Sequence, residues 1–247
     1  MTTTLQKYLT IATAATAATA ALGGLAGSAE AATFGTSGIQ FDQDTDVNFT
    51  FQVSHGAYKS TLSIYEVVSG AVAENSAFVL FSETRGTDNN CANECKGTFG
   101  NAVTSQTGSQ TVSYKFLGGK TYTLGLDSGR AGRVYSTNTL NLFNNTNTQQ
   151  AVFGPNVAEE LDGSTTNNFA LASQRTQADP YVAGGVDVGF DDRGNRNDTD
   201  FQDFVVTAQA IRPEIKEEPE SVPEPATLAG LGLAASTLVL SRRRKKA

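Results

Sequence analysis

The stretch Asp46-Val47-Asn48-Phe49-Thr50-Phe51-Gln52-Val53-Ser54 determines the fold class. Apolar residues occupy every second position of this stretch, and polar residues stand between them. Because successive side chains of a strand point to opposite faces, this period of two predicts a strand with one buried face and one face in water. We therefore expect at least one sheet that covers a core with one of its faces.

The same pattern recurs along the body of the chain, and helical periodicity is scarce. Further strands are expected at Thr61–Val68, Thr111–Phe116, Tyr122–Leu126 and Phe204–Ala210. The sequence Leu117-Gly118-Gly119-Lys120 joins the second and third of these runs, and its double glycine predicts that they pair as a hairpin. Many short, half-buried strands around one core are typical of an antiparallel β-sandwich, so we expect an all-β domain of this kind over residues 32–212.

The first residues have the composition of an export signal. Lys7 is the one early charge, residues 9–27 form an uncharged run rich in small residues, and Ala29-Glu30-Ala31 has the small-x-small form of a signal-peptidase site. We predict that residues 1–31 form a signal helix that signal peptidase removes after Ala31. An uncleaved N-terminal helix is the alternative, although the threonines of the run make it a poor permanent membrane span.

The exported body is expected to be acidic. Residues 32–212 contain 19 Asp and Glu against 11 Lys and Arg, which gives a formal charge of −8 with the one His neutral. Nucleic acid and anionic lipid are poor partners for such a surface. Divalent cations suit it better, and through them anionic polysaccharide.

Two cysteines, Cys91 and Cys95, lie close together in the chain. Export favours a disulfide between them, with free thiols as the alternative. A soft-metal site would need two more Cys or His ligands, and the one histidine, His55, is distant in the sequence. We expect the pair to close a short loop rather than to perform metal or redox chemistry.

Aspartate is concentrated near the end of the body. Six aspartates, at 187, 191, 192, 198, 200 and 203, fall within 17 positions. Asp198 and Asp200 would share one face of an extended backbone, and a loop at Gly194 would fold Asp191 and Asp192 back toward them. Carboxylate oxygens are the hard ligands that calcium prefers, so we predict a calcium site formed by Asp191, Asp192, Asp198, Asp200 and Asp203. Solvated turn residues that keep the loop soluble are the alternative.

This segment also resembles the end of a domain of unknown function found in bacterial surface proteins. The resemblance rests on Gly189-Phe190-Asp191-Asp192, followed by Asp198-Thr199-Asp200-Phe201-Gln202-Asp203 before a final strand. Gln202 departs from the family pattern, which prefers Asn at that position. The resemblance implies a β-sandwich with calcium binding and does not imply an activity.

A second acidic run, Asp42-Gln43-Asp44-Thr45-Asp46, begins with the spacing of a calcium loop. Valine occupies positions 47 and 53, where an EF-hand would need Gly and Glu. We interpret this run as a turn that enters a strand, with a contribution to a cation site as the lesser alternative.

Signals for catalysis are weak. A Ser/His/Asp arrangement would have to use His55, and no G-x-S-x-G elbow surrounds it. Paired carboxylates for glycoside hydrolysis stay open, with Glu66, Glu159 and Glu160 among the candidates. The chain has no tryptophan, although sugar-processing clefts usually rely on aromatic platforms. We therefore expect a protein that is not an enzyme.

The C-terminal residues combine three features in a fixed order. Pro223-Glu224-Pro225 comes first, an uncharged apolar stretch over residues 226–240 follows, and a basic cluster begins with Arg242, Arg243 and Arg244. As a helix the apolar stretch would reach roughly 22 Å, short of a hydrocarbon core about 30 Å thick. Positive charge resists translocation, so the cluster would stay in the cytoplasm and the body would lie outside. We predict one short transmembrane helix, preceded by a Pro/Glu-rich linker over residues 213–221.

In motif and order, residues 222–247 resemble the PEP-CTERM sorting signal of Gram-negative bacteria. The resemblance implies that an exosortase, a membrane transpeptidase, recognises the Pro-Glu-Pro segment and removes the helix and the basic tail. It also implies an association with exopolysaccharide and biofilm matrix.

Two functions are compatible with these features. We expect a calcium-stabilised protein of the cell surface or extracellular matrix, and a carbohydrate-binding module is the alternative. A flat row of exposed tyrosines on one sheet face would favour the module. A face covered by Thr, Asn and Ser would favour the matrix protein.

Overall fold

The computed structural model describes residues 32–87, 96–129, 132–143, 146–147, 149–155, 157, 173–192 and 201–212. The chain divides into two units, Met1–Arg212 and Pro213–Ala247, and every described residue belongs to the first. The predicted signal helix, linker, transmembrane helix and basic tail therefore lie outside the described residues. Within the described part of the chain, no helix is long and apolar enough to cross a membrane.

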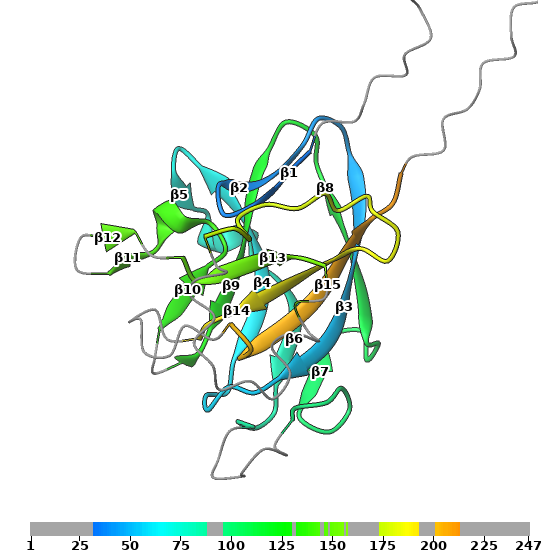
Figure 1. Ribbon diagram of the computed structural model, residues 1–247, viewed down its shortest axis with the longest axis vertical. Coiled ribbons are helices and arrows are strands. Elements are labelled where there is room, and N and C mark those ends of the chain that lie inside the picture. Colours follow the sequence, from blue (N-terminus) through cyan, green and yellow to red (C-terminus); the bar gives the residue numbers. More distant parts are fainter. Residues whose placement is uncertain are drawn as a thin grey trace, which may run out of the picture. The chain divides into compact units, whose positions relative to one another are not determined.

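Strands make up most of the regular structure (Figure 1). In chain order they are β1 (Ala32–Gly35), β2 (Gly38–Phe41), β3 (Thr45–Ser54), β4 (Thr61–Val68), β5 (Ala71–Val72), β6 (Phe78–Glu83), β7 (Val103–Ser105), β8 (Thr111–Phe116), β9 (Thr121–Asp127), β10 (Arg133–Tyr135), β11 (Leu142–Phe143), β12 (Thr146–Asn147), β13 (Ala151–Gly154), β14 (Val186–Phe190) and β15 (Phe204–Ala210). The short 3-10 helices η1 (Glu74–Ser76) and η3 (Asn138–Leu140) lie between strands.

The strands form two main antiparallel sheets that enclose one core. The larger sheet has the order β1-β2-β9-β4-β6-β7, with β10 beside β9 and β5 beside β4, and the smaller sheet has the order β13-β14-β15-β3-β8. A separate pair is formed by β11 and β12. Fully buried side chains from both sheets meet in the core, among them Phe49 and Phe51 of β3 and Leu62 and Ile64 of β4. The prediction of an all-β, antiparallel sandwich is confirmed.

The central strand β3 follows the predicted alternation as far as Gln52, but Val53 is half-buried and Ser54 is buried, opposite to the prediction. Val47, Phe49 and Phe51 are buried, and the polar residues between them are exposed or half-exposed. The register toward β15 shifts between Val205 and Val206, so β3 carries an extra residue there. This irregularity lies next to the end of β3 that forms the candidate site.

The predicted hairpin between residues 111–116 and 122–126 is wrong. β8 pairs with β3 in the smaller sheet, whereas β9 pairs with β2, β4 and β10 in the larger sheet. The turn between them therefore crosses from one sheet to the other. Gly119 has a φ of 73°, and a Cβ on Gly118 would lie 2.6 Å from Gln43 Cα. The double glycine permits this close crossing, which has the same local requirements as a hairpin turn.

Candidate metal site

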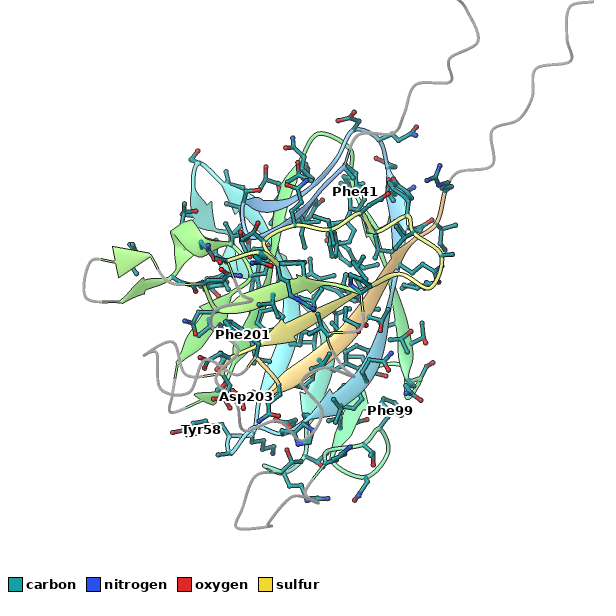
Figure 2. The ribbon with its side chains drawn as sticks, viewed as in Figure 1. Phe41, Tyr58, Phe99, Phe201 and Asp203 are labelled. Atoms are coloured by element: carbon teal, nitrogen blue, oxygen red, sulfur yellow. The ribbon has the colours of Figure 1, made fainter. Side chains whose placement is uncertain are left out.

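Two strand ends bring three aspartates together. β14 ends at Phe190, which pairs with Phe204 at the start of β15. Asp191 and Asp192 therefore leave β14 where Asp203 enters β15, and the antiparallel register places them at the same end of the sheet. Figure 2 labels Asp203 at this end.

The three carboxylates are close enough to hold one cation. Asp191, Asp192 and Asp203 each offer an oxygen, and these oxygens lie within 4.8 Å of one another. The three residues are 0%, 3% and 8% exposed, respectively. The backbone N–H of Asp192 donates to Asp203 Oδ2 at 2.8 Å and so ties the two segments together. Ionised carboxylates are unfavourable in such a place, because they repel one another and burial removes their hydration.

The residues that follow β3 form one wall of this cluster. The N–H groups of His55 and Gly56 both donate to the carbonyl oxygen of Asp203, at 3.2 and 3.3 Å. A Cβ on Gly56 would lie 2.8 Å from Asp192 Oδ2 and 3.4 Å from Asp203 Cβ. A side chain at this position would therefore displace the Asp192 carboxylate, and glycine lets the chain after β3 approach the cluster without this displacement.

Phe201 anchors the segment that leads into β15. Its side chain is buried in a small cluster with Val152 and Val157. Its backbone has a φ of 57°, in the left-handed region, which costs about 1–3 kcal/mol for a residue with a side chain. Burial of the ring offsets this cost and fixes the backbone two residues before Asp203.

A further buried carboxyl lies beside the same end of β3. Ser54 Oγ donates to Glu83 Oε1 at 2.6 Å, and the N–H of Ser60 donates to Glu83 Oε2 at 2.8 Å. Burial raises the pKa of Glu83 to about 7, and the two hydrogen bonds only partly oppose this shift. Since Ser54 directly precedes His55 and Gly56, Glu83 and the aspartate cluster contact the same short segment of the chain.

The structure unites three of the five predicted calcium ligands, Asp191, Asp192 and Asp203. Asp198 and Asp200 lie outside the described residues, as do Cys91, Cys95 and the residues of the sorting motif. The turn at Asp42–Asp46 enters β3 as predicted, and Asp44 Oδ1 accepts a hydrogen bond from the N–H of Gly118.

Sequence reasoning missed Gly56 and Glu83. Neither residue belongs to a motif. Gly56 contacts the cluster, and Glu83 contacts Ser54 beside it, only through the pairing of distant strands. The one local hint is that Gly56 follows directly on the end of the strongest strand pattern.

The outer face of the smaller sheet is covered by hydroxyl, amide and carboxylate groups. Thr50 Oγ1 and Thr111 Oγ1 share a hydrogen bond of 2.9 Å across β3 and β8. Gln52 Nε2 donates to Thr207 Oγ1 at 2.8 Å, and Thr207 Oγ1 donates to Asp187 Oδ1 at 2.6 Å. The polar side chains of this face thus bond one another from strand to strand.

The tyrosines do not form an exposed row. Within the described part of the chain, each tyrosine is buried or half-buried. Tyr65 of the larger sheet is covered by the Arg133 guanidinium at 4.9 Å from its ring centre and packs edge-on against Tyr135. The described tyrosines therefore do not form the flat aromatic platform that would favour a carbohydrate-binding module.

The C-terminal residues match a family model. The model of the PEP-CTERM protein-sorting motif covers residues 221–245. The chain carries a PEP-CTERM sorting signal. This confirms the resemblance seen in the sequence and supports an exported protein that is anchored in the membrane and then processed by an exosortase. No curated protein and no solved structure matches the chain.

The body continues toward the PEP-CTERM signal from the end of the smaller sheet opposite the aspartates. β15 is a strand of 7 residues that begins next to Asp203 and ends at Ala210, which separates its two ends by roughly 20 Å. After it, the N–H of Ile211 donates to Asp46 O at 2.8 Å, and the Arg212 guanidinium lies 5.3 Å from the ring centre of Tyr181. The aspartate cluster is therefore remote from the point where the chain leaves the sandwich.

Proposed function

We propose that this chain is a structural protein of the cell surface or extracellular matrix, and that a calcium ion bound by Asp191, Asp192 and Asp203 stabilises its sandwich. The observation that carries the proposal is the burial of three carboxylates whose oxygens lie within 4.8 Å of one another. The protein has no catalytic role in this proposal. The PEP-CTERM sorting signal supports a location at the cell surface or in the matrix. We further propose that the protein associates there with the exopolysaccharide of a biofilm.

The chemistry of the donors favours calcium. The clustered ligands are all carboxylates, which prefer hard cations. Calcium binds oxygen at about 2.3–2.6 Å, so two oxygens on one ion lie at most about 5 Å apart. The three aspartates satisfy this limit and supply part of the six to eight oxygens that calcium takes. Asp198, Asp200, backbone carbonyl groups and water are the proposed remaining ligands.

Burial favours a structural role for the ion over a bridging role. A calcium ion shared with a polysaccharide needs open coordination positions that reach solvent, and Asp203, the most exposed of the three described ligands, is 8% exposed. An enclosed ion would instead hold the end of β14, the start of β15 and the segment at Gly56 together. We therefore assign the ion to the stability of the fold.

The surface of the smaller sheet favours a matrix protein over a carbohydrate-binding module. Its outer face carries the hydrogen-bonded set Thr50, Thr111, Thr207 and Asp187 rather than aromatic rings. A hydroxyl-rich face can contact hydrated polymers by many weak hydrogen bonds without a specific pocket. This supports a broad association with matrix rather than the selection of one sugar.

Thermal unfolding of the exported protein tests the calcium site. The melting temperature should rise by about 5 °C or more from EDTA to millimolar calcium, because an ion that binds only the folded state stabilises it. The double variant Asp191→Asn, Asp203→Asn should lose most of this rise and still fold in EDTA, since it also loses the repulsion. Asp187→Asn is the matched control, because Asp187 has the same side chain on the outer face of β14 and should retain the rise.

Equal melting temperatures in calcium and EDTA would overturn the calcium site. The matrix assignment is tested separately by incubating the exported protein with a panel of exopolysaccharides, with and without calcium. Weak retention by several polymers supports it. Strong retention by a single oligosaccharide would instead support the carbohydrate-binding module, and cleavage of any polymer would contradict a non-catalytic role.

A further inference from the structure

Most sheet edges of the described sandwich are covered by other backbone. The segment 175–178 runs between β13 and β1 and bonds both of them, since the N–H of Phe153 donates to Arg175 O at 2.9 Å and the N–H of Ala178 donates to Phe34 O at 3.0 Å. At the edge of β7, Val103 forms a bridge with Phe99. These contacts protect three edges from pairing with another chain.

The strand β8 is different. It lies at the side of the smaller sheet beyond β3 (Figure 1), and within the described part of the chain β3 is its one strand partner. Its 6 residues pair with β3 without a register shift, so the edge has no bulge, and its sequence has no proline. A regular edge of this length, with no described strand beyond it, is a template for a further strand.

The hydrogen-bond pattern shows which backbone groups of β8 point outward from the sheet edge. The N–H of Phe51 donates to Gln110 O at 3.0 Å, which makes these two residues a hydrogen-bonded pair. In an antiparallel pair such residues alternate with residues whose N–H and C=O point away from the partner. Thr111, Ser113 and Lys115 therefore direct their backbone groups to the open edge. The N–H of Thr111 already donates to Ser109 Oγ, which leaves the groups of Ser113 and Lys115 at the centre.

The side chains of β8 restrict what can pair with this edge. Outward-facing Thr111, Ser113 and Lys115 are exposed, whereas Tyr114 faces inward, is half-buried and packs 5.0 Å from the half-buried ring of Phe78. A further strand must continue a polar outer face and an apolar inner face. An apolar side chain of that strand must also pack against the half-buried Phe78 and Tyr114 rings where they are exposed at the edge.

We propose that β8 pairs with β8 of a second copy of this chain, in an antiparallel arrangement with its two-fold axis at Ser113. In this register Ser113 lies opposite Ser113 of the second copy, Thr111 lies opposite Lys115, and Val112 lies opposite Tyr114. The polar side chains of the two strands then lie on one face of the joined sheet, and the apolar side chains lie on the other. Tyr114 of each copy packs beside Val112 of the other copy, at the edge of the core. Each Lys115 lies opposite a threonine rather than a like charge, and it keeps its ion pair with Asp44 at 3.3 Å. The two smaller sheets become one continuous sheet.

The mass of the exported protein in solution tests the pairing. Sedimentation at tens of micromolar should give twice the monomer mass. Ser113→Pro should give a monomer, because it removes an N–H at the axis that β3 does not use, and an edge strand accepts proline at such a position. Ser113→Ala is the matched control, which retains the N–H and should remain a dimer. A monomeric wild type, or a Ser113→Pro variant that is still a dimer, would overturn the proposal.

A cysteine pair tests the register without relying on proline. Residues that form a hydrogen-bonded pair across two strands have Cα atoms about 5.5 Å apart, within the range of a disulfide. Ser113→Cys should therefore give a covalent dimer on mild oxidation, seen on a non-reducing gel. Lys115→Cys should not, because the two copies of residue 115 would lie about 14 Å apart. Equal cross-linking of both variants, or of neither, would exclude this register, and the wild type gives the background from Cys91 and Cys95.

Discussion

The backbone N–H of Gly56 donates to the carbonyl oxygen of Asp203 at 3.3 Å, and the Cα of this glycine faces the carboxylate of Asp192. The end of β3 is thereby joined to the start of β15, although the two lie far apart in the sequence. The candidate calcium ligands are therefore positioned both by the aspartate-rich segment and by the chain that follows β3.

Gly56→Ala should weaken calcium binding more than it weakens the protein without calcium. The new Cβ would lie 2.8 Å from Asp192 Oδ2. In EDTA the carboxylate can rotate away at small cost, but in calcium the same rotation removes a ligand. We expect the melting temperature to fall by several degrees in calcium and by clearly less in EDTA. Equal losses in the two buffers would mean that Gly56 serves packing alone.

Glu83 should make the stability of the fold depend on pH. Burial raises its pKa from 4.5 to about 7, so between these values the native state holds a proton that the unfolded state has released. The contribution of this group to the free energy of unfolding is therefore greatest at low pH and falls by about 3 kcal/mol as the pH rises through 7. Glu83→Gln cannot ionise and should lose this dependence. Urea unfolding of both proteins at pH 5 and pH 8 measures the difference, and parallel pH profiles would contradict it.

At Phe201, the glycine variant should be more stable than the alanine variant, which is the reverse of the usual order. Phe201→Ala removes a ring buried against Val152 and Val157 and should cost about 3 kcal/mol. Phe201→Gly loses the same ring, but glycine accepts the φ of 57° without strain. We therefore expect the glycine variant to be more stable than the alanine variant by about 1 kcal/mol, whereas glycine is usually the less stable of the two. Urea denaturation ranks them, and the usual order would show that the left-handed backbone is not maintained.

The fold class followed from the sequence because the alternation in β3 is a local property. Val47, Phe49 and Phe51 are buried in the order that the pattern predicts. The pairing of strands is not local, which is why the hairpin prediction failed. The sequence around Gly118 and Gly119 requires a tight turn, but it does not specify whether the next strand returns to the same sheet or crosses to the other one.

The candidate site was predictable in part for the same reason. Aspartates at 191, 192 and 203 are close in the chain, and the antiparallel pairing of β14 with β15 brings them together. Gly56 and Glu83 approach this region only because β3 pairs with β15 and β6 pairs with β4. The periodicity and spacing of residues in a single sequence do not predict such long-range contacts.

Pro225→Ala should retain the exported chain at the membrane. In the sorting signal the Pro-Glu-Pro segment precedes the apolar stretch over residues 226–240, and loss of a proline should prevent recognition by the exosortase, so that this stretch and the basic tail remain attached. The intact mass of the wild-type protein released from cells should lack Arg242, Arg243 and Arg244, whereas the variant should remain in the membrane fraction at full C-terminal length. Both forms should melt at the same temperature, because the sandwich ends at Arg212, where Tyr181 and Asp46 already hold the chain. Release of wild-type protein that still carries the three arginines, from cells with an active exosortase, would contradict the processing step.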